Sequence, residues 1–194
     1  MSLQASVPEL LAALAQVLRT LGVRWYLFGA QAAVLWGRPR LSADVDATAE
    51  VPPERALELV AAMARGGFDL RLTRDVEGFV ARTRVLPFVE RASGIPLDII
   101  LAGPGFEEEF LDRAVSIRVG AADIPVISPE DLIVTKILAG REKDLEDIRG
   151  VLAERLDRLD IARIRETLSL LEQALGQSDL TPLFEQQLRG RDGG

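Results

Sequence analysis

The sequence predicts an α/β fold followed by a helical C-terminal segment. Short apolar runs alternate with helical patterns over the first two thirds of the chain, and only helical patterns follow. The change is sharp because Ser128 is a good N-cap residue and Pro129 follows it at the first helical position. We expect an α/β core over residues 1–127, a helical segment over 128–188 packed on that core, and a flexible tail over 189–194.

The expected elements follow from periodicity and from Gly and Pro positions. Helices are expected over 7–21, 30–36, 52–67, 106–114, 128–139 and 142–176, the last with a break near 159–160. Strands are expected over 25–28, 44–49, 68–74, 79–85, 95–102, 115–119 and 124–126, with a turn near 77–78. This order predicts a mixed sheet with flanking helices.

Composition excludes several kinds of site. The 194 residues include no cysteine and no histidine, so disulfides, thiolate zinc sites and histidine-based catalytic triads are excluded. Any metal must accept oxygen ligands, which favours Mg²⁺, Mn²⁺ or Ca²⁺. The net charge of −7 argues against nonspecific DNA binding. No membrane span or secretory leader is evident, so we expect a cytoplasmic protein.

Three aspartates predict a cation site. Side chains alternate between the faces of a strand, so Asp44 and Asp46 project to the same side. Asp98 interrupts an apolar strand, where burying an unpaired charge is costly. If the two strands are neighbours, the three carboxylates repel one another unless a divalent cation lies between them. Such a site can hold two metals, as in phosphoryl transfer.

Gly29 supports a phosphate site beside these aspartates. It ends an apolar strand and precedes a helix that starts at Ala30. A glycine at such a turn lets backbone N–H groups approach a phosphate, and the helix points its positive end there.

These residues resemble the signature of the nucleotidyltransferase (polymerase-beta-like) superfamily, over roughly residues 25–150. Ala30 stands where that family has Gly or Ser, and Asp98 stands where it has a third carboxylate. The segment 132–147 resembles the Lys…Arg-x-Lys-Asp-x-x-Asp stretch of AbiEii-type toxins and their uncharacterised relatives. The residues that match the first motif are Phe28-Gly29-Ala30, Gly37-Arg38-Pro39-Arg40, Ser42 and Asp44-Val45-Asp46.

The resemblance implies a nucleotidyltransferase-like mixed sheet and an enzyme that uses Mg²⁺ or Mn²⁺. The implied reaction transfers a nucleoside monophosphate from an NTP to an acceptor hydroxyl of tRNA, other RNA or a protein. A toxin with an antitoxin partner is one such enzyme. The implied catalytic and metal-binding residues are Asp44, Asp46 and Asp98, and the implied nucleotide-binding residues are Gly29, Ala30, Arg40 and Lys136.

A second hypothesis is a catalytically inactive module on the same fold that binds a nucleotide or a partner. Ala30 and the acidic balance favour it, because alanine offers no hydroxyl to a phosphate.

Each candidate residue also has a structural interpretation. Asp44 and Asp46 could form a solvated strand edge, and Asp98 could pair with an arginine of residues 82–91. Lys136, one of only two lysines, could lie along the core stripe of its helix instead of reaching a phosphate. Arg38 and Arg40 could hold the turn around Pro39. For Asp144 and Asp147 we favour ion pairs with Lys143 and Arg141.

Overall fold

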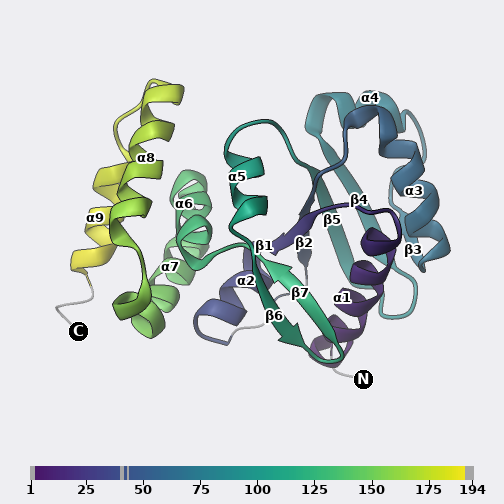
Figure 1. Ribbon diagram of the computed structural model, residues 1–194, viewed down its shortest axis with the longest axis horizontal. Coiled ribbons are helices and arrows are strands. Elements are labelled where there is room, and N and C mark those ends of the chain that lie inside the picture. The colour runs from purple at the N-terminus through teal and green to yellow at the C-terminus, as the bar shows by residue number, and fades with distance from the viewer. Residues whose placement is uncertain (1–2, 40–41, 43, 191–194) are drawn as a thin grey trace. The chain divides into compact units, whose positions relative to one another are not determined.

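The computed structural model describes residues 3–39, 42 and 44–190 (Figure 1). The chain divides into two compact units. The first consists of residues 1–31 and 41–127, and the second of residues 32–40 and 128–194. The packing of the helical segment on the core stays a prediction.

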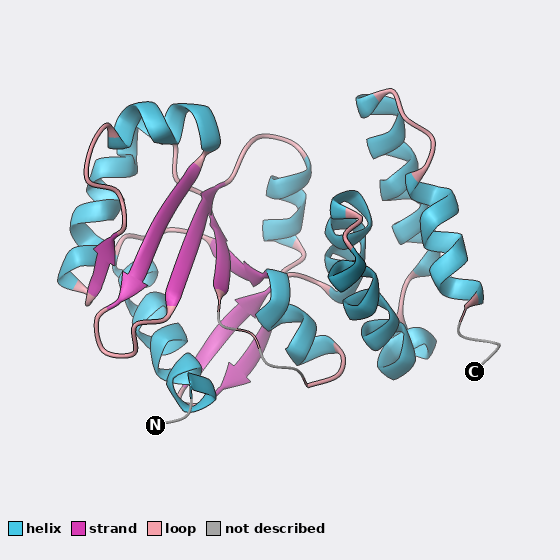
Figure 2. Cartoon of the chain, turned by 180° about the vertical axis from the view of Figure 1, so that it is seen from behind, coloured by secondary structure: helices cyan, strands magenta, loops and turns pink. Residues whose placement is uncertain are grey.

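A mixed sheet, whose strands are drawn in magenta in Figure 2, lies in the first unit. It has seven strands in the order β3-β4-β5-β2-β1-β7-β6. Strand β2 is parallel to β5 and β1 is parallel to β7, while the remaining neighbours are antiparallel. The predicted α/β class with a mixed sheet is therefore confirmed. The strands are β1 (Trp25–Phe28), β2 (Val45–Ala49), β3 (Phe68–Leu70), β4 (Val85–Glu90), β5 (Pro96–Leu101), β6 (Val115–Val119) and β7 (Ala122–Val126).

Helices of the first unit cover parts of this sheet. Helix α1 lies against β7 and β6, and α3 lies against β3 at one edge of the sheet (Figure 1). The helices are α1 (Leu3–Thr20), α3 (Ala56–Arg65), α4 (Val76–Thr83) and α5 (Phe106–Asp112), with a 3-10 turn, η1 (Pro53–Arg55), before α3.

The burial pattern of β5 separates a core face from an accessible face. Leu97, Ile99 and Leu101 are buried, while the alternate residues, including Asp98, are partly exposed. Apolar side chains on one face therefore leave the other face available for polar groups.

The second unit is a group of packed helices. Helix α2 (Gly29–Trp36) begins in the first unit and ends here. Helix α6 packs against α7, α8 and α9, and α9 also packs against α7 and α8. The helices are α6 (Pro129–Ala139), α7 (Glu142–Arg155), α8 (Ile161–Leu175) and α9 (Leu180–Arg189), with a 3-10 turn, η2 (Leu156–Arg158), after α7.

Arg155 fastens the end of α2 to α7 within this unit. Its guanidinium lies 4.6 Å from the ring centroid of Trp36, and its Nε donates to the Trp36 carbonyl at 2.8 Å. A stacked and hydrogen-bonded arginine orders both helix ends.

The strand predicted over 79–85 is wrong, because residues 76–83 form helix α4. The Asp75 carboxylate caps this helix by accepting from the backbone N–H of Gly78 at 3.1 Å. A Cβ at Gly78 would lie 2.4 Å from Asp75 Oδ1, so this glycine permits the cap. The expected turn glycine thus belongs to a helix N-terminus, and the strand alternation begins at Val85.

Other boundaries differ less. Strand β3 ends at Leu70, four residues before the predicted end, and Asp44 directly precedes β2. Helix α9 falls almost wholly within the helical segment predicted over 128–188, although no separate helix was expected after residue 176. In the part of the chain that the structure describes, every helix is too short or too polar to span a membrane.

Candidate active site

Asp46 and Asp98 lie side by side on neighbouring strands. They are direct partners in the parallel register of β2 and β5. Directly opposed residues point to the same face of a sheet, so the two carboxylates project together. The Asp98 side chain is 40% exposed, and Asp46 is also partly accessible. The sequence-predicted meeting of these two aspartates is therefore present at the accessible face.

Gly29 brings the start of helix α2 against Asp46. It has a φ of +67°, and Phe28, the preceding residue, is the antiparallel partner of Asp46. A Cβ at position 29 would lie only 2.2 Å from Asp46 Oδ2. Only glycine tolerates both this backbone conformation and this close approach. The N-terminal turn of α2, with its partial positive charge, thus begins beside the Asp46 carboxylate.

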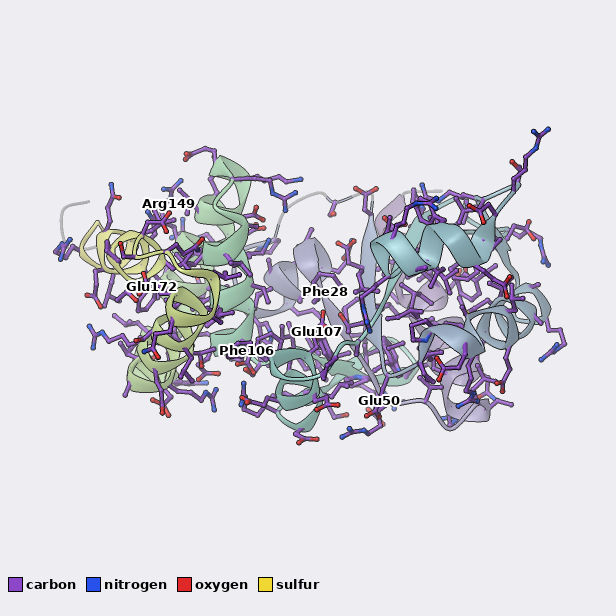
Figure 3. The ribbon with its side chains drawn as sticks, turned by 90° about the horizontal axis from the view of Figure 1, so that it is seen from above. Phe28, Glu50, Phe106, Glu107, Arg149 and Glu172 are labelled. Atoms are coloured by element: carbon purple, nitrogen blue, oxygen red, sulfur yellow. The ribbon has the colours of Figure 1, made fainter. Side chains whose placement is uncertain are left out.

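The two ends of the β1–β2 pair carry different polar groups. Phe28 marks the end with Asp46, and Glu50 lies beyond the other end, where Ala49 pairs with Trp25 (Figure 3). Arg24 binds Glu50 there through two short hydrogen bonds, 2.7 and 2.8 Å. The Asp46 carboxylate therefore lies at the end of the β1–β2 pair opposite the Arg24–Glu50 ion pair.

Two further residues of the nucleotidyltransferase signature, Asp44 and Ala30, lie just before β2 and at the start of α2. Asp44 is exposed just before β2, and its carbonyl oxygen accepts from Gln31 Nε2 and from Ser42 Oγ, each at 3.4 Å. Ala30 lies in the first turn of α2 and contributes backbone N–H only. Arg40, a predicted nucleotide ligand, lies outside the described residues.

The donor set fits a hard cation held by two protein carboxylates. Among the residues described, no three acidic side chains are grouped closely enough to hold one ion. Mg²⁺ commonly uses only one or two carboxylates and completes its octahedron with water and substrate phosphates. Asp46 and Asp98 supply that number of carboxylates at adjacent register positions. The three-aspartate site that includes Asp44 stays a prediction.

Asp98 has an ion-pair partner that sequence reasoning missed. Arg71 Nη2 contacts Asp98 Oδ1, whereas the alternative interpretation of Asp98 named an arginine of residues 82–91. Arg71 directly follows β3, and its backbone N–H donates to the Pro87 carbonyl at 2.8 Å. Pro87 is the register partner of Asp98, so the Arg71 side chain reaches across β4. Only the strand order could have revealed this pair.

Lys136 lies in a buried ion cluster of the second unit. Its Nζ is 2.9 Å from Asp144 Oδ1 and 2.7 Å from Asp147 Oδ2. Arg141 also binds Asp144, which confirms one of the ion pairs that we favoured. In this structure the Lys136 ammonium binds two carboxylates. Its contact with nucleotide phosphate stays a prediction.

Burial and ion pairing act in opposite directions on Asp144. Burial by itself raises the pKa of its carboxyl, but hydrogen bonds and charge from Arg141 and Lys136 outweigh burial and lower that pKa below its ordinary value. The folded protein therefore holds Asp144 ionised.

A cavity of about 500 Å³ lies in the second unit. Its polar lining consists of Arg38, Glu146, Asp147, Arg149 and Gln187. Arg149 Nη1 donates to Gln187 Oε1 at 3.2 Å. Arg38, a candidate phosphate ligand beside Pro39, forms an exposed ion pair in which its Nε lies 3.8 Å from Glu154 Oε1.

Replacing Gly29 with alanine should destabilise the protein more than replacing Gly22. Both glycines have nearly the same positive φ, +67° and +65°, but no atom lies within 4 Å of a Cβ at Gly22. Alanine in this conformation costs about 1–2 kcal/mol at either position. The clash with Asp46 should add about 1–3 kcal/mol to Gly29→Ala. Urea unfolding of both variants measures the difference, and equal losses would show that Asp46 moves away freely.

Replacing Lys136 with methionine should lower the free energy of unfolding by about 3–5 kcal/mol, because two buried carboxylates lose their ammonium. Lys143→Met is the matched control, since the side chain of Lys143 is exposed on the neighbouring helix, and it should cost less than about 0.5 kcal/mol. Adding Asp144→Asn and Asp147→Asn to Lys136→Met should recover most of the loss. Equal effects of the two lysine variants in urea titrations would contradict this role.

The Asp144 carboxyl should make the protein sensitive to acid. Its pKa is lower in the folded than in the unfolded chain, so its contribution is complete above about pH 4 and is lost as pH falls through the folded pKa. The difference in unfolding free energy between wild type and Asp144→Asn should therefore shrink below about pH 4. A difference that stays constant from pH 6 to pH 3 would exclude this linkage.

Comparisons with known proteins identify the fold and the family. No curated protein sequence matches the chain. The solution structure of the antibiotic-resistance factor ANT(2'')-Ia has a TM-score of 0.59 at 16% identity and covers 89% of this chain and 98% of its own. An antigenic nucleotidyltransferase-like protein from Paracoccidioides brasiliensis has a TM-score of 0.59 at 18% identity and covers 93% of each chain. The lincomycin-bound lincosamide antibiotic adenylyltransferase LnuA has a TM-score of 0.51 at 16% identity, covering 73% of this chain and 94% of its own.

The structural similarities show a shared fold and confirm the predicted nucleotidyltransferase-like sheet. The family model covers most of the two units, because it matches residues 9–175. The chain therefore belongs to the family described as nucleotidyltransferase of unknown function (DUF6036).

Proposed function

We propose that this protein transfers a nucleoside monophosphate from an NTP to an acceptor hydroxyl with the help of Mg²⁺. The observation that carries the proposal is the adjacent pair Asp46 and Asp98 beside the start of helix α2. The pair provides oxygen ligands, and the helix start provides backbone N–H groups for phosphate oxygens.

The residues have distinct roles in the proposed reaction. Asp46 and Asp98 would hold the ion, with Asp44 as the predicted third ligand. A bound divalent cation supplies positive charge that neutralises the triphosphate and lowers the pKa of the attacking hydroxyl. Backbone N–H groups at Gly29 and Ala30 would orient the phosphates. Asp98 would accept the hydroxyl proton as the new O–P bond forms and pyrophosphate leaves.

The close contact between Gly29 and Asp46 favours a working site over an inactive module. Gly29 has a φ of +67°, and a Cβ on this residue would lie 2.2 Å from Asp46 Oδ2. A turn with a purely structural role does not need a carboxylate this close. Ala30 removes one hydroxyl but leaves its backbone N–H in the first turn of α2. The inactive module remains the second hypothesis and makes a different prediction for transfer.

The acceptor is proposed by class only. Two structures with this fold contain an antibiotic or its adenylyl derivative: ANT(2'')-Ia in complex with adenylyl-2''-tobramycin, and the lincomycin-bound lincosamide antibiotic adenylyltransferase LnuA. The proposed acceptor is therefore a hydroxyl of a small molecule, of tRNA or other RNA, or of a protein. The toxin role with an antitoxin partner stays a prediction.

Nucleotide transfer should depend on the adjacent aspartates. The assay supplies each α-labelled NTP with Mg²⁺ and, in separate reactions, total RNA, a protein extract, tobramycin or lincomycin as acceptor. Asp46→Asn and Asp98→Asn should each lower labelled product by about 10²-fold or more, as removal of a transition-state contact does. Asp69→Asn is the control, because Asp69 lies on β3 of the same sheet and pairs with Arg91.

The transfer assay, together with calorimetric titration with Mg²⁺ and each NTP, separates the enzyme from the inactive module. Transfer that is lost in Asp46→Asn but kept in Asp69→Asn supports the enzyme. Nucleotide binding in the wild type without transfer to any of these acceptors supports the module instead. Transfer that survives both Asp46→Asn and Asp98→Asn would place the chemistry elsewhere.

A further inference from the structure

Arg71, the ion-pair partner of Asp98, has a fixed backbone and a movable side chain. The backbone N–H of Arg71 is held by the Pro87 carbonyl at 2.8 Å. Its side chain, however, is 41% exposed, and the described contacts of its guanidinium are with one carboxylate. Long exposed side chains change rotamer readily, so the guanidinium can leave Asp98 without any movement of the strands.

Asp98 cannot keep this partner and also ligate a divalent cation at full strength. A guanidinium in hydrogen-bond contact with the carboxylate would stand within a few ångströms of the ion, and like charges at that distance repel. Arginine stays protonated at any working pH, so it must be displaced rather than neutralised. The displaced group then needs another anionic partner near the same face of the sheet.

A nucleoside triphosphate supplies such a partner. It brings several phosphate oxygens to the ion, and the planar guanidinium fork matches phosphate geometry with two parallel hydrogen bonds. We propose that Arg71 is a partner-switching residue of the candidate site, which pairs with Asp98 before the metal binds and with the triphosphate of the metal-bound nucleotide afterwards. This inference rests on the proposed function and names a residue that the family motif does not include.

A purely structural ion pair is the competing explanation, and the same sheet offers a matched example. Arg91 Nη2 lies 2.9 Å from Asp69 Oδ1, with side chains 53% and 52% exposed. This pair joins an arginine just past β4 to an aspartate on the adjacent β3, whereas Arg71 reaches Asp98 across β4. Asp46 and Asp98 are not part of it. Exposed pairs of this kind contribute little to stability. Arg91→Ala therefore controls for the loss of an ion pair as such.

The experiment measures two affinities on the full chain. Binding of Mn²⁺ alone is followed by electron paramagnetic resonance, and binding of each Mg²⁺·NTP is followed by calorimetry. In Arg71→Ala, Mn²⁺ should bind about 3- to 10-fold tighter, because a competing charge is gone. The same variant should bind Mg²⁺·NTP about 10-fold more weakly, because a phosphate contact is gone. Arg71→Lys should restore the wild-type Mn²⁺ affinity but only part of the nucleotide affinity, since lysine keeps the charge and lacks the fork.

The opposite signs of the two shifts distinguish switching from a structural role. Arg91→Ala should change neither affinity, and thermal melts confirm that all variants fold. Equal affinities in Arg71→Ala and wild type, or a change of both in the same direction, overturn the proposal while leaving the proposed function standing. A wild type that binds no Mg²⁺·NTP overturns the proposed function itself, and the switch with it.

Discussion

The parallel register of β2 and β5 is the constraint on which the candidate site depends. It places Asp46 directly beside Asp98 on one face of the sheet. Two carboxylates in adjacent register positions repel each other, and a sheet gains nothing from that arrangement by itself. The surrounding chain compensates: the start of α2 lies against Asp46 through Gly29, and Arg71 reaches Asp98 from beyond β4. Both compensations leave room for a ligand, because a helix terminus and an exposed arginine can each exchange partners.

The local part of this arrangement could be predicted from the sequence. The phase of Asp98 among apolar residues, and the glycine between an apolar strand and a helix, are encoded within short stretches. These stretches predict that Asp46 and Asp98 share one face of the sheet, provided that the two strands are neighbours. The Cβ distance at Gly29 could not be predicted, because it depends on how β1 and β2 pair.

The non-local parts could not be predicted, for two physical reasons. The partner of Asp98 depends on the order β3-β4-β5, and Arg71 precedes Asp98 by 27 residues with a helix between them. The strand predicted over 79–85 is wrong because Gly78, which is typical of a turn, instead accommodates the Asp75 cap of α4 through its missing Cβ. In both cases the outcome depends on a side-chain contact that propensity alone does not describe.

Exposure separates the charges that hold the fold from those that can act on a ligand. The cluster of Lys136, Asp144 and Asp147 has side chains only 7%, 2% and 4% exposed. Arg141, whose own side chain is 62% exposed, adds a second positive group beside Asp144. Removing Lys136 would leave two buried carboxylates without their ammonium, so the buried part of the cluster resists ligand exchange. Asp98 and Arg71, about 40% exposed, carry no such penalty. The same chemical pairing thus stabilises helices α6 and α7 in one unit and leaves a carboxylate available for a cation in the other.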